Sequence, residues 1–152
     1  MVSMLPDTTA VAKQSLLRDP LISRIVRTVF LPNDERLFEH AHEWIERGGN
    51  VLLFPEGTRS PEDGMRPFKR GAAQLAARTG APIVPVGICL DRRILGKGQS
   101  ILDMGESRIH YGFSAGSEIL PPVLGQDVPH HEARLLTDEL RERIAALCNA
   151  PP

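Results

Sequence analysis

The sequence has no large excess of charge of either sign and very little cysteine. Its 18 lysine and arginine residues stand against 19 aspartate and glutamate residues, so the formal net charge is −1. A nearly neutral chain has no global field to attract a polyanion, which disfavours nucleic acid as a partner. The two cysteines, Cys89 and Cys148, are too few for a disulfide framework. We therefore expect both thiols to be reduced and the protein to be cytoplasmic.

Long apolar runs are also missing. The longest, around Ile83 to Leu90, is far shorter than the roughly 20 residues that a helix needs to cross a bilayer. Residues 1–13 lack the basic segment followed by an apolar stretch that is typical of a signal peptide. We expect no membrane-spanning helix, and peripheral contact with the inner face of a membrane stays open.

The 152 residues have the composition of a soluble globular domain, with 41% hydrophobic and 24% charged residues. Several stretches have the apolar spacing of helices, and glycine follows two of them as a helix stop. Asp34 is a candidate N-cap for the second. The predicted helices are Leu16–Val29, Asp34–Ile45 before Gly48 and Gly49, Lys69–Thr79 before Gly80, and Glu132–Leu147 with Leu135, Leu136, Leu140, Ile144 and Leu147 on its apolar side.

Short apolar runs between these helices predict buried strands at Val51–Phe54, Ile83–Leu90 and Ser107–Phe113. Strands that alternate with helices indicate an α/β fold with a mixed, mainly parallel sheet flanked by helices. We place the domain at residues 1–125, with residues 126–152 as a C-terminal helix that packs on it or trails it. Ligands of such sheets bind beyond the carboxyl ends of the strands, so the loop after Phe54 is the expected site.

The residues of that loop are suited to an anion. Gly57 lets the backbone approach a ligand, Thr58 supplies a hydroxyl, and Arg59 supplies a planar guanidinium that matches phosphate or carboxylate. Lys69 opens the next helix, whose positive end adds to the attraction. The residues thus favour a phosphate-binding loop that carries one carboxylate, Glu56, although an ordinary solvated turn is the plainer alternative.

The string Phe54–Ser60, which reads FPEGTRS, resembles the acceptor-binding motif of the lysophosphatidate and glycerol-3-phosphate acyltransferases. Phe68–Ala72 is similar to the segment that follows this motif in the family, and Pro82–Val86 to the family's last block. The stretch from Val11 resembles the segment that precedes the second motif of the family. The resemblance covers residues 8–90, in the order and with the spacing of the family.

The resemblance implies an enzyme of phospholipid biosynthesis that moves an acyl group from coenzyme A or acyl carrier protein to a hydroxyl. The acceptor would be a lysophospholipid-like molecule or a glycerol phosphate, and no further cofactor or metal is implied. Glu56 and Gly57 would shape the acceptor site, with Thr58 beside them, while Arg59 and Lys69 would hold the phosphate. Pro85 and Val86 would border the acyl-chain pocket.

The sequence departs from the family pattern at Asn33, which stands where the second motif usually ends in an arginine. Asn33 can donate a hydrogen bond to the acceptor but adds no charge. This difference indicates an acceptor other than ordinary lysophosphatidate.

The larger departure concerns the catalytic pair, which in the family is a histidine with an aspartate five positions later. The histidines of this sequence are His40, His42, His110, His130 and His131. The residues five positions after them are, in the same order, Ile45, Arg47, Ala115, Leu135 and Leu136, and none is aspartate. We expect a chain that begins late, without the family's first strand and helix, and is inactive or impaired alone. The alternative is a non-catalytic module that binds phosphorylated lipid or acyl carrier protein. His40 and His42 point to different helix faces, so no metal site is expected.

Overall fold

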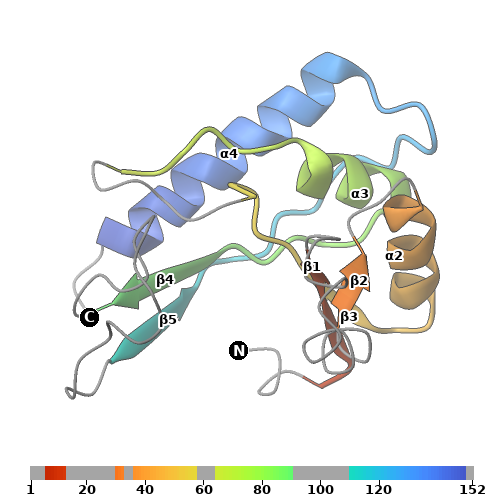
Figure 1. Ribbon diagram of the computed structural model, residues 1–152. Helices are drawn as coiled ribbons and strands as arrows, with labels where there is room; N and C mark the ends of the chain where they lie inside the picture. Colours follow the sequence, from red (N-terminus) through yellow and green to blue (C-terminus); the bar gives the residue numbers. More distant parts are fainter. Residues whose placement is uncertain (1–5, 13–29, 33–35, 58–63, 91–109, 150–152) are drawn as a thin grey trace.

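The computed structural model describes residues 6–12, 30–32, 36–57, 64–90 and 110–149. In chain order, the elements of this part of the chain are β1 (Thr8–Ala12), β2 (Phe30–Pro32), α2 (Leu37–Glu46), β3 (Asn50–Leu52), α3 (Gly71–Thr79), β4 (Val86–Leu90), β5 (Tyr111–Ala115) and α4 (His130–Asn149) (Figure 1). Helices and strands alternate through the middle of the chain, as the α/β prediction requires.

The strands form a parallel and an antiparallel group. β1 is the central strand of the order β2-β1-β3 and runs parallel to both neighbours, with Ala10 opposite Phe30 on one side and Leu52 on the other. β4 and β5 pair antiparallel, from Val86 opposite Ala115 to Leu90 opposite Tyr111. Two of the three strand pairings among the described residues are parallel, which confirms the predicted mixed, mainly parallel α/β class.

Two strands were missed by the sequence prediction. β1 has the sequence TTAVA, which shows neither a long apolar run nor a clear alternation. It is a strand because it lies between two others, and this central position buries Thr9 and Ala10, which are 5% and 0% exposed. β2 is three residues long and ends in a proline. The predicted helix over residues 16–29 and the candidate cap Asp34 lie outside the described residues.

Two of the predicted strands are shorter in the structure, and the third, β5, continues to Ala115 and is exposed rather than buried. β3 ends at Leu52, and Phe54 lies beyond it with 53% of its surface exposed, so the prediction of a buried strand to Phe54 was wrong. β4 begins at Val86 rather than at Ile83, because Pro85 has no N–H for a strand ladder. Ile83 instead forms a separate antiparallel bridge with Ile119.

A glycine follows the end of both α2 and α3, which confirms the predicted helix stops. α3 ends at Gly80, whose left-handed backbone, with φ +72°, lets its N–H donate to Ala76 O at 2.7 Å. α2 is followed by Gly48, with φ +83°. The indole of Trp44 near the end of α2 donates from Nε1 to Asp7 O at 3.2 Å and so ties the helix to the residue before β1.

The main core lies where α4 packs against α3 and the Ile83–Ile119 bridge, and it contains Ala73, Ile119, Leu136 and Leu140. Figure 1 shows α4 crossing above α3, with β4 and β5 below its C-terminal part. Leu136 and Leu140 confirm the predicted apolar side, but Leu135 was assigned to it wrongly. It is 58% exposed because the next position along a helix is turned by about 100°. No helix among the described residues combines the length and apolar character that crossing a bilayer requires.

Candidate functional site

The site begins in the loop that leaves the carboxyl end of β3. Gly57 N–H donates to Phe54 O at 2.9 Å, which closes a tight turn over Pro55 and Glu56. Gly57 has φ +65°, a conformation that favours glycine. The turn therefore places the backbone of the motif beyond the end of a strand parallel to β1, where ligands of α/β sheets bind.

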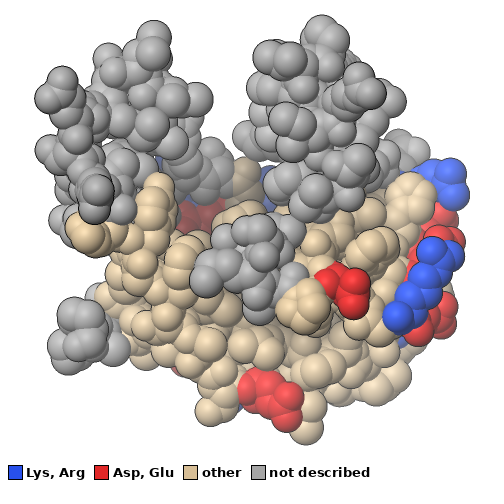
Figure 2. Space-filling model, turned by 90° about the horizontal axis from the view of Figure 1, so that it is seen from below, with Lys and Arg blue, Asp and Glu red and all other residues tan. Residues whose placement is uncertain are grey.

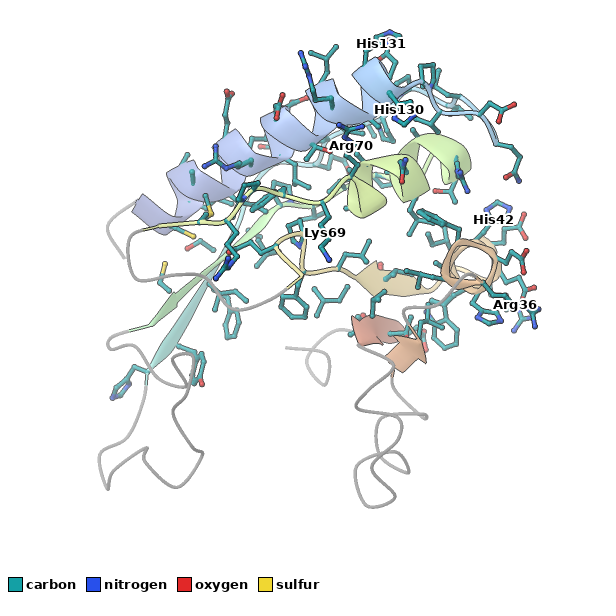
Figure 3. All side chains as sticks on the ribbon, turned by 45° about the horizontal axis from the view of Figure 1, so that its top comes forward. Arg36, His42, Lys69, Arg70, His130 and His131 are labelled. Carbon is teal, nitrogen blue, oxygen red and sulfur yellow. The ribbon has the colours of Figure 1, made fainter. Side chains whose placement is uncertain are left out.

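The side chain of Lys69 lies over this turn. Its backbone N–H donates to Pro55 O at 2.8 Å, so the segment before α3 is bonded to the loop. A β-carbon built on Gly57 would lie 2.9 Å from both Cε and Nζ of Lys69. The ammonium therefore occupies the space that a side chain at position 57 would fill, and Figure 3 shows Lys69 extending from the segment before α3 toward the loop. The structure brings together these two predicted site residues and places the positive charge of the exposed Lys69 at the half-buried turn.

Glu56, the carboxylate of the motif, is half-buried and accepts a hydrogen bond from the Arg66 backbone N–H to Oε2 at 3.0 Å. A bond from an N–H to an ionised carboxylate is stronger than one between neutral groups. It joins the start of the loop to the segment that returns toward Lys69. Glu56 thus braces the loop. Thr58, Arg59 and Asn33 lie outside the described residues, and their predicted contacts with the acceptor stay predictions.

The predicted acyl-pocket residues lie at the start of β4. Pro85 is fully buried, and its carbonyl accepts the Gly116 N–H at 2.9 Å. Val86 is half-buried and pairs with Ala115. Their role in an acyl pocket stays a prediction.

Several large apolar side chains in or near the strands are exposed. They include Phe54, Val84, Tyr111 and Phe113, which are 45–53% exposed. The rings of Tyr111 and Phe113 stack with centroids 6.4 Å apart. The sequence prediction did not include this exposed surface, although the spacing of two between Tyr111 and Phe113 in a strand places both on one face. Seen from below Figure 1, the described surface is largely uncharged, and charged side chains gather along one edge, where α2 lies (Figure 2).

The sequence also did not predict a contact between the N-terminal ends of α3 and α4. Arg70 Nη1 lies within hydrogen-bond distance of His130 Nδ1, at 3.1 Å. The other described histidine contacts are local ones, His42 with Glu46 and His131 with Glu132, both at 3.3 Å. His42 lies on α2, away from Lys69 (Figure 3). Among the described residues, no three histidine, cysteine or acidic side chains cluster as a metal site.

The fold and the loop together define an α/β protein with a lysine ammonium at a tight turn beyond the end of a parallel strand. The sequence model of the family described as Acyltransferase matches residues 1–89, more than half of the chain. The chain therefore belongs to the acyltransferase family, as the resemblance of the FPEGTRS string predicted.

Named relatives support this membership. The chain is 37% identical over 108 residues to the 1-acyl-sn-glycerol-3-phosphate acyltransferase BAT2, chloroplastic, of Brassica napus, an alignment that covers 70% of this chain and 28% of that protein. It is 29% identical over 154 residues to the 1-acyl-sn-glycerol-3-phosphate acyltransferase of Escherichia coli K12, covering 95% of this chain and 56% of that protein. The chain thus spans between about a quarter and about half of the length of these relatives.

The fold has a counterpart of known structure. The crystal structure of the 1-acyl-sn-glycerophosphate acyltransferase PlsC from Thermotoga maritima matches with a TM-score of 0.59 and 20% sequence identity. The match covers 96% of this chain and 59% of that protein. The likeness shows that the two share a fold.

Proposed function

We propose that this chain is part of an acyltransferase that transfers an acyl group from a thioester to the hydroxyl of a lysophospholipid-like or glycerol-phosphate acceptor. The observation that carries the proposal is the Lys69 ammonium held across Gly57, in a loop whose sequence resembles the family's acceptor-binding motif. The names of the relatives, which are 1-acyl-sn-glycerol-3-phosphate acyltransferases, support the same acceptor class.

The loop suits an acceptor that carries a phosphate. Lys69 supplies one positive charge at the turn, and Arg59, two residues after Gly57, supplies a guanidinium that can bond two phosphate oxygens. Glu56 accepts the Arg66 N–H and so holds the described start of the loop, which means that the turn beside Lys69 needs little reordering when an anion binds. In this proposal Asn33 adds a hydrogen bond without charge.

The reaction is an acyl transfer. The acceptor hydroxyl oxygen attacks the thioester carbonyl, a C–O bond forms, the C–S bond breaks, and the hydroxyl proton passes through a base to the departing thiolate. Coenzyme A and acyl carrier protein present the same thioester, so both are donors in this proposal. The acyl chain would lie toward Pro85 and Val86, and exposed apolar residues such as Phe54 would suit peripheral contact with the inner membrane face.

The residue that acts as the catalytic base is not identified among the described residues. None of the five histidines in the sequence has an aspartate five positions later, and the described partners of His42 and His130 are Glu46 and Arg70. We therefore propose that the chain alone is inactive or severely impaired. The same observation favours one alternative, a cytoplasmic module that binds phosphorylated lipid or acyl carrier protein without catalysis.

The test measures thioester consumption over a panel of acyl donors and lysolipid acceptors. The 152-residue chain is compared with a version extended upstream, from its own genomic locus, through a His-x-x-x-x-Asp segment. In the active form, Lys69→Met should raise the KM for a phosphate-bearing acceptor by about 10- to 100-fold, the effect of losing a hydrogen bond to a charged group. Arg36→Ala is the matched control, because it removes a positive charge that pairs with Glu39 on the distant helix α2 (Figure 3).

Each outcome separates the alternatives. Turnover by the extended form alone, abolished by Arg59→Ala, supports a truncated acyltransferase. Turnover by the short chain unaided would show that another residue supplies the base. Saturable lysolipid binding by both forms without turnover would favour the non-catalytic module. A KM that responds equally to Lys69→Met and Arg36→Ala would contradict the role of the loop.

A further inference from the structure

The two cysteines meet although 59 positions separate them in the sequence. Cys89 lies in β4, and Cys148 lies in the last turn of α4. Cys89 Sγ is 3.9 Å from the carbonyl oxygen of Cys148, and the Cys148 thiol interacts with both the Cys89 side chain and the Ile88 backbone. Both cysteines are free thiols. The described fold therefore places two thiols side by side at the junction of a strand and a helix end.

Close backbone packing brings β4 and the C-terminal end of α4 together. A β-carbon built on Gly87 would lie 2.9 Å from the β-carbon of Leu147 and 3.3 Å from the backbone nitrogen of Cys148. Gly87 and Cys89 are two positions apart in β4, so they face the same side of the strand. The absence of a side chain at Gly87 thus allows the end of α4 to approach β4 and brings Cys148 to Cys89.

The thiols are also accessible. Gly112 pairs with Cys89 across the β4–β5 ladder, and a β-carbon there would be 3.7 Å from that of Cys89. Because position 112 has no side chain, the strand opposite Cys89 leaves space beside the Cys89 β-carbon. Cys89 is half-buried and Cys148 is exposed. A small reagent can therefore reach the pair without unfolding the domain.

We infer that Cys89 and Cys148 form a site of reversible thiol oxidation, at which an intramolecular disulfide joins β4 to the end of α4. The pair needs no large rearrangement, because the strand and the helix end already touch at Gly87 and Leu147. This inference goes beyond the proposed acyl transfer and does not depend on it.

The oxidant is a low-molecular-weight disulfide such as oxidised glutathione. One cysteine thiolate attacks a glutathione sulfur and expels one glutathione thiolate, and the second cysteine then attacks the mixed disulfide and expels the other. The two cysteines lose two protons and two electrons, and the glutathione disulfide becomes two thiols. Partial burial against β4, together with the neighbouring Cys89, raises the pKa of the Cys148 thiol, so the exchange should be faster in mildly alkaline buffer than at neutral pH.

The experiment incubates the full chain with oxidised glutathione at mildly alkaline pH and follows free thiols, intact mass and thermal unfolding. The expected product has lost two hydrogens and both free thiols, and its digest contains one peptide that joins position 89 to position 148. Closing this long loop should raise Tm by roughly 5–15 °C relative to the reduced chain. Dithiothreitol should reverse all of these changes.

Cys89→Ser and Cys148→Ser are the matched controls, since each leaves one thiol that can only gain a single glutathione. Two glutathiones on the wild-type chain, a cross-linked dimer on a non-reducing gel, or an unreacted native chain would each overturn the inference.

Discussion

The ammonium of Lys69 lies where the side chain of residue 57 would be, 2.9 Å from a β-carbon built on Gly57. The contact joins residues 12 positions apart, and the bond from Lys69 N–H to Pro55 O holds the two segments together. The glycine therefore does more than allow the turn at φ +65°. Its lack of a side chain leaves room for a positive charge directly on the loop.

Gly57→Ala should separate the effect of the glycine on the turn conformation from its effect on the position of the Lys69 ammonium. The new methyl group must displace the Lys69 ammonium, which is easy because the lysine side chain is flexible, so binding of a phosphate-bearing lysolipid should weaken. Stability should fall by about 1–2 kcal/mol, the cost of a left-handed residue with a β-carbon. Gly125→Ala is the matched control, since Gly125 has φ +69° with open space around it. Urea denaturation should show similar losses for both, and equal lysolipid affinities would contradict the role of Lys69.

Gly49→Ala should destabilise the junction between α2 and β3. A β-carbon there would overlap the indole of Trp44, a rigid ring held by its bond to Asp7 O. Overpacking of this kind costs about 1–3 kcal/mol. Trp44 is the only tryptophan in the sequence, so its fluorescence during urea unfolding reports on this site. Gly71→Ala, with nothing within 4 Å, should be neutral or slightly stabilising; a similar loss there would point to a general effect of glycine replacement.

Leu140→Ala and Leu135→Ala compare the two sides of α4. Leu140 is 4% exposed in the core with Leu136, so its truncation should lower the free energy of unfolding by about 2–5 kcal/mol. Leu135 is 58% exposed, and its truncation should change that free energy by no more than about 0.5 kcal/mol. The same substitution in the same helix controls for helix propensity. Equal losses in urea denaturation would mean that α4 packs with a different face.

Cys148 should make stability depend on pH in alkaline solution. Its pKa is raised in the folded chain by burial and by Cys89, so folding disfavours the thiolate. The stabilising contribution is full below about pH 8.5, the ordinary thiol pKa, and is lost as pH rises through the folded pKa. Cys148→Ser should therefore flatten part of the alkaline fall in unfolding free energy under reducing conditions. An identical slope in the variant would contradict this effect.

Local patterns in the sequence predicted much of this structure correctly. Glycines that stop helices act through backbone conformation at single positions, which is why the end of α3 at Gly80 could be read directly. The motif that begins at Phe54 likewise predicted a loop beyond a strand. Leu135 shows the limit of such patterns, since the sequence alone did not define which of two adjacent leucines faces the core.

The sequence by itself determined the α/β class, the glycine stops and the position of the loop, because these depend on periodicity and on residues close together in the chain. Only the tertiary structure decided that β1 is a strand, since its Thr-Thr-Ala-Val-Ala sequence is weakly apolar and its pairing with two distant segments buries it. The same holds for Lys69 over Gly57, Arg70 beside His130 and Cys89 beside Cys148. Each of these contacts depends on how whole elements pack, and no local pattern in the chain records that packing.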